Sequence, residues 1–256
     1  MRKMKPILIA MTVLAIAVPL MAEEEEKPPM TVAKSHFIDV SPGQALEFEA
    51  AYKGHIQWHA NMNDTWYWHT WQIVNGENLG QYIVRTGDHQ WSDWDEHAEF
   101  SKEDGAHFWK NVAPFVQDIS SVMVMSNMEI SNWTKDYGMP TMVEVTVFHL
   151  KGEHGRAFYS AVKKLHEAIV EKEMPFTYTW SSVASGSDGP TMILVFPYKS
   201  WADIGAAMGV PFWKMVEEVY GEFETDMLRK MFPKSVSSQE NFIAAYREDM
   251  SYNPPE

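Results

Sequence analysis

Alternating apolar and polar positions predict two β-hairpins in this chain. In the first, runs rich in aromatic and β-branched residues at positions 66–74 and 79–85 flank the dipeptide Asn75-Gly76. An Asn-Gly pair between two such runs is a strong hairpin signal, because both residues tolerate the positive φ angles of a tight turn. A weaker copy follows about 110 residues later, where residues 175–183 and 191–196 flank a turn at 185–190.

The remaining pattern predicts helices and strands around the two hairpins. Apolar residues at helical spacing predict helices at residues 42–61, 102–116, 155–172, 200–207, 210–220 and 223–231. Alternation predicts strands at residues 35–40, 120–130, 142–150 and 238–246. Ser41 and Pro42 are predicted to start the first helix as its cap and first residue. Each half of the chain therefore has the order β-α-β-β-α-β.

Matching residues accompany this matching order. The sequence Phe-Trp-Lys-Asn-Val at 108–112 corresponds to Phe-Trp-Lys-Met-Val at 212–216, and Trp71 corresponds to Trp180. We therefore predict an α+β fold made of two fused ferredoxin-like βαββαβ repeats, at residues 35–131 and 140–250, with residues 251–256 as a tail. Each antiparallel sheet is covered by helices on one face, so the two open faces are expected to pack together as one pseudo-symmetric, barrel-like unit.

This arrangement resembles the dimeric α+β barrel superfamily, and within it the duplicated, NIPSNAP-like branches. The resemblance spans residues 35–246 and depends on the element order and the repeated Phe-Trp-Lys. It implies activities such as those of haem-degrading and cofactor-free monooxygenases or of chlorite dismutase-type haem enzymes. The Asn of the haem-degrading branch is absent from the strand at residues 35–40, so that branch's Asn-Trp-His triad is not transferred. Haem is implied by the resemblance alone, and the cofactor stays open.

The N-terminus has the pattern of an export signal. Arg2, Lys3 and Lys5 precede an apolar run at residues 7–20, and a cleavage site follows at Ala22. We expect a cleaved signal peptide at residues 1–22, a disordered tether at 23–34, and a periplasmic or secreted protein. The apolar run is shorter than the roughly 20 residues of a membrane span, so no stable membrane insertion is expected after cleavage.

Composition narrows the function classes. The chain has no Cys, so it forms no disulfide, thiolate nucleophile or iron–sulfur site. Its formal net charge is −14, and loss of the three basic residues of the signal would make it −17. A surface this acidic repels nucleic acid. The sequence also lacks the hydrolase elbow, phosphate-loop and dinucleotide motifs. A small-molecule ligand is the expected partner, with the chain as a monomer or a homodimer.

The aromatic strand at residues 66–73 carries the main candidate chemistry. Because side chains alternate in a strand, Tyr67, His69, Trp71 and Ile73 share one face, and Trp66, Trp68, Thr70 and Gln72 share the other. His69 among aromatic rings could act as a general base or bind haem; a hydrogen-bonded core histidine explains the same pattern. Arg85 could hold an anionic oxygen, or it could be an ordinary charge at a strand end.

From these residues we predict a pocket between the sheet and the helices of the first half. His69 and Arg85 are the expected catalytic residues. The predicted ligand-binding residues are His36, Trp66, Trp68, Trp71, Tyr178 and Trp180. Since one pocket is lined by only one face of a strand, part of this set is expected to lie elsewhere.

His55 and His59 have the i, i+4 spacing that presents two imidazoles on one face of a helix. No Glu completes a His-Glu-x-x-His motif, and we assign no metal site to them. The sequence thus favours an exported small-molecule-binding protein or cofactor-light oxidoreductase. A non-catalytic interaction module and a haem-binding protein are the alternatives.

Overall fold

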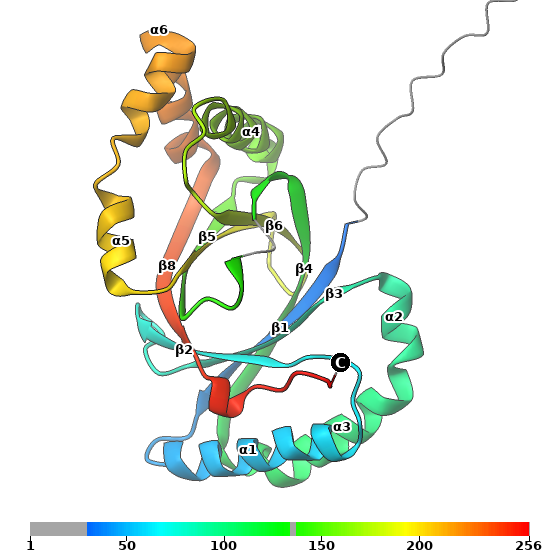
Figure 1. Cartoon of the computed structure of the whole chain (residues 1–256). Coiled ribbons are helices and arrows are strands. Elements are labelled where there is room, and N and C mark those ends of the chain that lie inside the picture. The colour runs from blue at the N-terminus through cyan, green and yellow to red at the C-terminus, as the bar shows by residue number, and fades with distance from the viewer. Residues whose placement is uncertain (1–29, 134–136, 256) are drawn as a thin grey trace, which may run out of the picture.

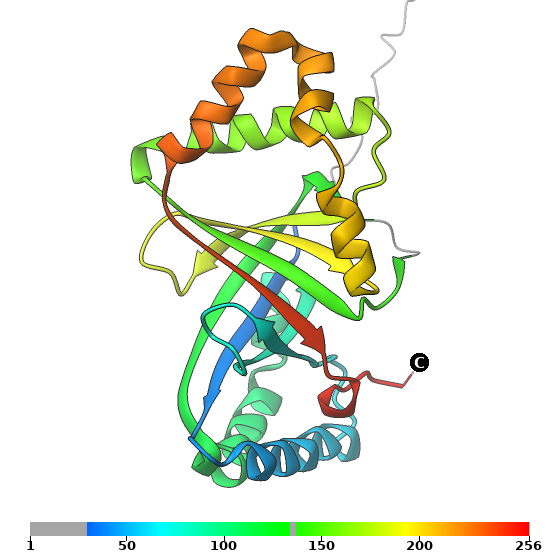
Figure 2. The same cartoon turned by 90° about the vertical axis from the view of Figure 1, so that its left-hand side faces the viewer.

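A computed structural model describes residues 30–133 and 137–255. Within these residues, eight antiparallel strands form one closed barrel in the order β1-β3-β2-β8-β5-β7-β6-β4. Helices α1, α2 and α3 lie outside the barrel on one side, and α4, α5 and α6 lie outside it on the opposite side (Figures 1 and 2).

Each half has the predicted order of elements. The first contains β1 (Val32–Val40), α1 (Ala45–Asn61), β2 (His69–Asn75), β3 (Tyr82–His89), α2 (Trp91–Glu96), α3 (Ala98–Asn111), the 3₁₀ turn η1 (Ala113–Phe115) and β4 (Val116–Asn132). The second contains β5 (Met142–Leu150), η3 (Gly152–His154), α4 (Gly155–Glu171), β6 (Tyr178–Ser185), β7 (Thr191–Tyr198), α5 (Trp201–Met208), α6 (Phe212–Ser235) and β8 (Val236–Tyr246). A last 3₁₀ turn, η4 (Glu248–Met250), follows.

The barrel order confirms the predicted fold class. The first half contributes β4-β1-β3-β2 and the second contributes β8-β5-β7-β6, which is the same order in both. The two sheets join at two seams, where β2 pairs with β8 and β4 pairs with β6. Apolar side chains from both sheets fill the barrel interior, among them Trp71, Val145 and Phe242. Separate apolar clusters lie between each sheet and its own helices.

A glycine at the start of each hairpin loop, Gly76 after β2 and Gly186 after β6, lies against the other half of the barrel. Gly76 has φ +126°, and a Cβ there would be 2.7 Å from the Cβ of Phe242 on β8. Gly186 has φ +92°, and a Cβ there would be 2.4 Å from the backbone oxygen of Ser121 on β4. The sequence predicted both turns, and the structure adds that each turn is packed tightly into a seam.

Several boundaries differ from the sequence prediction. Helix α1 begins at Ala45 with Gln44 as its cap, so the prediction that Ser41 and Pro42 start it is wrong; those residues form a turn before it. Strand β1 begins at Val32, so three residues of the predicted tether belong to the barrel. The predicted signal peptide and the rest of the tether lie outside the described residues. No helix of the described ranges is long and apolar enough to span a membrane.

The segment after β8 returns to the first half instead of forming a free tail (Figure 1). Met250 is fully buried among the residues packed under α1. The backbones of Trp68 and Tyr252 exchange two hydrogen bonds of 2.8 Å. Arg247 donates from Nη1 and Nη2 to the two oxygens of Glu49 on α1, each at 2.7 Å. Residues 247–252 therefore form part of the first half's structure.

We expect Glu49→Gln to destabilise the protein by about 1–2 kcal/mol at pH 7, because it replaces a charged, two-point contact with Arg247. The hydrogen bond from Arg247 lowers the pKa of Glu49 to about 2, against an ordinary value of 4.5. The contribution of this pair is therefore present above pH 4.5 and is lost as the pH falls towards 2. Urea unfolding at pH 7 and pH 3 measures it: the gap between wild type and variant should shrink at pH 3.

Glu47→Gln is the matched control for this variant, since Glu47 is exposed on the same helix. It should change stability by less than about 0.5 kcal/mol at either pH. A gap between wild type and Glu49→Gln that stays constant with pH would contradict the assignment.

Candidate functional site

Each half contains a cavity between the outer face of its sheet and its helices. The first cavity has a volume of about 270 Å³ and the second about 390 Å³. The first is lined by residues from β1, β3, β4, α1 and α3 and by Trp68 just before β2: His36, Ile38, Tyr52, His55, His59, Trp68, Val84, Asp104, Gly105, Phe108, Trp109, Ile119, Ser120 and Ser121. Trp109 is 64% exposed, so the first cavity reaches the surface at α3.

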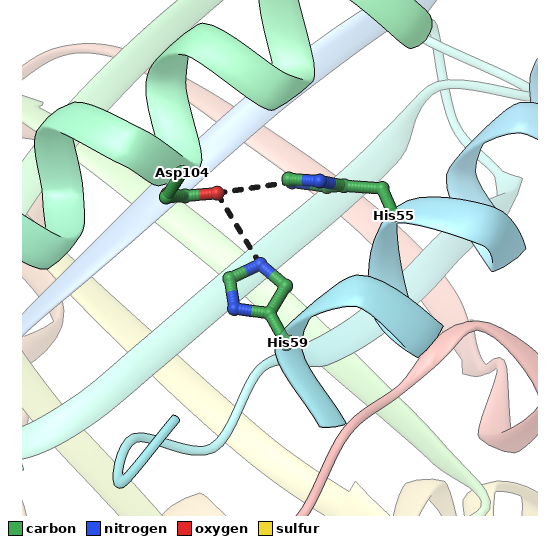
Figure 3. Close-up of side chains that lie close together, drawn as sticks. All are labelled: His55, His59 and Asp104. Atoms are coloured by element: carbon green, nitrogen blue, oxygen red, sulfur yellow. Dashed lines mark ion pairs between the residues drawn. The ribbon is translucent and has the colours of Figure 1, made fainter. Parts of the chain in front are cut away.

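Two histidines and an aspartate meet at one wall of the first cavity. His55 and His59 lie on successive turns of α1, and Asp104 faces them from α3 (Figure 3). Oδ1 of Asp104 is 3.1 Å from Nε2 of His55 and 3.3 Å from Nε2 of His59. Both histidines are buried, at 4% and 2% exposure.

Oδ1 of Asp104 has close neighbours but no hydrogen bond. It is buried, and no described residue forms a hydrogen bond to it. Burial alone would raise the pKa of Asp104, but the nearby His55 and His59 hold it below its usual range. Burial lowers the pKa of His55 despite Asp104. Burial also opposes protonation of His59, but Asp104 and Asp64 raise its pKa.

Asp64 anchors His59 from behind. Its side chain is completely inaccessible to solvent. Oδ2 accepts hydrogen bonds of 2.8 Å from Nδ1 of His59 and Nε1 of Trp68. Oδ1 accepts from the backbone N–H of Trp66 at 3.0 Å and from Nε2 of His97 at 3.1 Å. Because an ionised carboxylate only accepts, His59 carries its proton on Nδ1 and turns Nε2 toward Asp104.

His55 is held in the same way by a neighbouring imidazole. Its Nδ1 is 2.9 Å from Nδ1 of His107 on α3. The two rings are stacked with centroids 5.1 Å apart, and Trp58 stacks on His107 at 5.0 Å. When His55 donates through Nδ1, its Nε2 also presents a lone pair toward Asp104.

His36 is the remaining imidazole of the first cavity. It projects from β1, opposite the helices. Burial, together with the charge of Lys34, lowers its pKa to about 4, although Asp104 opposes the shift. His36 is therefore neutral at pH 7, and it can accept or donate a hydrogen bond to a molecule in the cavity.

The second half shows the same location without the two histidines and the aspartate. Helices α1 and α4 each have 17 residues, and their fully buried Phe48 and Phe158 are 110 positions apart. The same offset places Leu165 opposite His55 and Ile169 opposite His59. The repeated Phe-Trp-Lys places Met208 opposite Asp104. All three counterparts line the second cavity, so the polar cluster is a property of the first half only.

The second cavity is mostly apolar. Its few polar groups include His166, whose Nδ1 is 2.8 Å from the hydroxyl of Tyr178, and Glu144, which accepts from Tyr198 at 3.4 Å. No Lys or Arg is among its lining residues in the described part of the chain.

The predicted site residues do not share one cavity. His36 and Trp68 line the first, whereas Tyr178 and Trp180 line the second. Trp66 is buried outside both, stacked between His89 and His97 with centroids 3.8 Å from each ring. Trp71 belongs to the barrel interior.

His69 and Arg85, the predicted catalytic pair, lie on neighbouring strands and line neither cavity. Nε2 of His69 is 2.9 Å from Oδ1 of Asn253, and its ring stacks on Tyr67 at 4.3 Å. Arg85 donates to the hydroxyl of Tyr67 at 3.4 Å. Their partners are thus other side chains of the protein, and their catalytic roles stay a prediction.

Sequence reasoning missed Asp64 and Asp104. Asp104 is 45 positions from His59, in an acidic stretch where no pattern singles out one carboxylate. A comparison of the two halves was available, however. Two histidines on a helix whose counterpart carries Leu165 and Ile169 at the same positions signal a function specific to the first half.

Comparisons with known proteins support the fold. No family model matches the chain, and no curated protein matches its sequence. A solved anthrone oxidase-like protein is 10% identical over 89% of this chain and 94% of its own, with a TM-score of 0.58. A monooxygenase-like protein from Lactobacillus acidophilus is 11% identical over 88% of this chain and 97% of its own, with a TM-score of 0.55.

A chlorite dismutase variant from Candidatus Nitrospira defluvii is also similar, at 8% identity over 86% of this chain and 92% of its own, with a TM-score of 0.54. These similarities extend over nearly the whole described chain. At such low identity they establish a shared dimeric α+β barrel fold, as the sequence predicted, and not a shared activity.

Proposed function

We propose that this chain is a small-molecule oxidoreductase whose substrate occupies the first cavity. The observation that carries the proposal is the polar cluster of His55, His59 and Asp104 in a cavity whose counterpart is apolar at the same three positions. An apolar cavity with a few convergent polar groups is typical of a ligand site. The structural neighbours named as anthrone oxidase-like, monooxygenase-like and chlorite dismutase add support for oxidation chemistry.

The walls of the cavity favour a flat aromatic substrate. Tyr52, Trp68 and Phe108 provide aromatic surface, which stacks well on fused rings. The polar cluster on α1 and α3, with His36 across the cavity, favours a substrate oxygen that can accept or donate a hydrogen bond. A fused aromatic ring carrying an enolisable carbonyl satisfies both requirements.

The proposed reaction uses dioxygen as the oxidant. For anthrone, a representative of this class, the ring CH₂ loses two hydrogens and gains one oxygen atom from O₂ to become the second carbonyl of anthraquinone, and the other oxygen atom leaves as water. His36, neutral at pH 7, is placed to hydrogen-bond the substrate oxygen and favour the enol. The histidine–aspartate cluster would face the carbon that reacts.

Filling the first cavity should abolish both binding and oxidation. Gly105 on α3 lines the cavity, and a Cβ there meets no atom within 4 Å. Leu at this position would extend into the substrate's space without a backbone clash, and it suits a helix better than Gly. We expect Gly105→Leu to weaken anthrone binding, measured by calorimetry, and anthraquinone formation, measured by absorbance, by more than about 10-fold, with an unchanged or higher Tm.

Gly54→Leu is the matched control. Gly54 also has open space at its Cβ and a helical position, but it lies exposed on α1 outside the cavity. It should bind and oxidise anthrone as the wild type does. Equal activity of the two variants would place the substrate elsewhere, and the absence of oxidation by the wild type would overturn the proposed reaction.

Haem fits the two cavities poorly. Haem carries two propionates, but neither cavity has a Lys or Arg among its described lining residues, and the second presents the carboxylate of Glu144. His69, the predicted haem ligand, faces neither cavity. We therefore propose no reaction step that uses haem.

The finer sequence predictions remain proposals. The equal element order and the paired glycines Gly76 and Gly186 support an origin of the two halves by duplication. The NIPSNAP-like relationship rests on sequence resemblance alone. Export to the periplasm or beyond rests on the N-terminal pattern.

A further inference from the structure

We propose that His55, His59 and Asp104 bind one divalent first-row transition-metal ion, through Nε2, Nε2 and Oδ1. The inference concerns the same cavity as the proposed oxidation but does not depend on it. Two imidazoles and one carboxylate form a donor set that proteins use for zinc and for mononuclear iron, with further coordination positions left open.

The hydrogen-bond partners of the imidazoles allow both Nε2 atoms to be free of a proton. Nδ1 of His59 donates to Asp64, which can only accept. Nδ1 of His55 is occupied by His107, and we assign the proton between these two rings to His55. Two nitrogen lone pairs and a carboxylate oxygen then meet without a hydrogen atom between them. A cation bound between these three atoms would interact with all of them.

The distances from the Asp104 oxygen to the two imidazole nitrogens agree with a shared metal ion. Two ligands about 2.0–2.2 Å from one ion lie about 3.0–3.5 Å apart at octahedral or tetrahedral angles. The Asp104 oxygen is 3.1 Å from one nitrogen and 3.3 Å from the other, and all three atoms lie within 4.8 Å of one another.

The charges of the nearby carboxylates and the hydrogen bond that orients His59 also favour a metal ion. The carboxylates of Asp64 and Asp104 form ion pairs only with histidines among the described residues, and no Lys or Arg reaches either. A divalent ion would balance both charges. The hydrogen bond from His59 to Asp64 is also the usual carboxylate–histidine support of a metal ligand, which fixes the tautomer and the ring orientation.

A proton is the competing occupant of this space. A doubly protonated His59 would bridge Asp64 and Asp104 as a charge network with no metal. Against this reading, Oδ1 of Asp104 is buried and has no hydrogen-bond partner among the described residues, although Nε2 of His59 lies 3.3 Å away. A metal ion would instead be bound by all three atoms through their lone pairs.

The location leaves room for a substrate at the metal. The three ligands come from one wall, and the cavity of about 270 Å³ lies beside them. Open coordination positions would therefore face the cavity. The second half carries Leu165, Ile169 and Met208 at the positions that correspond in sequence, and all three line its cavity, so we expect one ion per chain and not two.

Cobalt titration of the full chain tests the inference directly. After metal is removed with EDTA, Co²⁺ should bind with a stoichiometry of one, measured by calorimetry, and should give visible absorption bands of a nitrogen- and oxygen-ligated ion. At about 100 times its Kd, Co²⁺ should raise Tm by roughly 5–10 °C. Zn²⁺ and Fe²⁺ should compete for the same site.

Three variants separate this site from non-specific binding. Asp104→Asn and His55→Leu should each weaken Co²⁺ binding at least about 100-fold and remove the rise in Tm. His55→Leu copies the second half's Leu165 and leaves the His59–Asp64 contact intact, so it covers the case in which Asp104→Asn fails to fold. His149→Gln, at a partly exposed imidazole 3.2 Å from Glu240, should bind Co²⁺ as the wild type does.

A wild type that binds none of the three ions, or the two site variants binding as tightly as wild type, would overturn the inference and leave the proton network. Metal binding without anthrone oxidation would contradict the proposed oxidoreductase function and leave the metal site supported. Oxidation of anthrone by the metal-free chain would show that the reaction does not need the ion. The cobalt titration would still show whether the metal site exists.

Discussion

Replacing Asp64 by Asn is expected to lower the free energy of unfolding by about 3–5 kcal/mol. All four acceptor positions of this inaccessible carboxylate are used, two of them by the imidazoles of His59 and His97. Asn has the same shape, but its NH₂ group is a donor. It would face two protein N–H groups that now donate to the carboxylate. Two buried donors would lose their acceptor, whichever way the amide is turned. Urea unfolding in the presence of EDTA measures this effect without a contribution from metal.

Asp88→Asn provides the control for this variant. Asp88 is exposed, accepts one bond of 3.2 Å from Tyr67, and has φ +63°, which Asn tolerates. It should change stability by less than about 0.5 kcal/mol. If Asp64→Asn were equally mild, Asp64 would not hold the first half's polar cluster in place.

Gly186→Ala is expected to destabilise the protein by about 2–4 kcal/mol. Part of this, about 1 kcal/mol, comes from the positive φ of +92°. The larger part comes from the new Cβ, which would be 2.4 Å from the backbone oxygen of Ser121. Since that oxygen belongs to β4, relief requires the seam between β4 and β6 to open. Chemical unfolding at pH 7 measures the total.

Two other glycines separate these two contributions. Gly80 has φ +91° but open space at its Cβ, so Gly80→Ala should show the backbone strain alone, about 1 kcal/mol. Gly189 has neither a positive φ nor a close neighbour, and Gly189→Ala should be neutral or slightly stabilising. Equal losses at Gly186 and Gly80 would show that the seam adapts without cost.

The fold was largely predictable because the turn residues and hydrophobic patterns of single segments agree with the order of strands and helices in the barrel. Strand β5 coincides with the predicted residues 142–150, and both hairpin turns were found from Asn75-Gly76 and its later copy. The start of α1 was misplaced because Ser41 and Pro42 also suit a turn, and local sequence does not distinguish the two. The barrel closure at the two seams depends on contacts between distant strands, which no local pattern reveals.

The site was only partly predictable, for the same physical reason. The spacing of His55 and His59 is a local signal and was visible. Their shared partner Asp104 comes from another helix, and Asp64 acts from the loop before β2. The predicted set mixed residues of both strand faces, so its members are distributed between two cavities and the barrel interior. Applying the comparison of halves to α1 and α4 as well would have singled out the two histidines.

The return of residues 247–252 to the first half has a consequence for how the protein is made. A chain is synthesised from its N-terminus, and early segments commonly fold first. Here Tyr252 donates through its hydroxyl to the backbone oxygen of Asp64 at 2.8 Å, and Met250 completes the packing under α1. The first half, although translated first, is thus completed last. We therefore expect the first half to reach its final packing only after residues 247–252 have been synthesised.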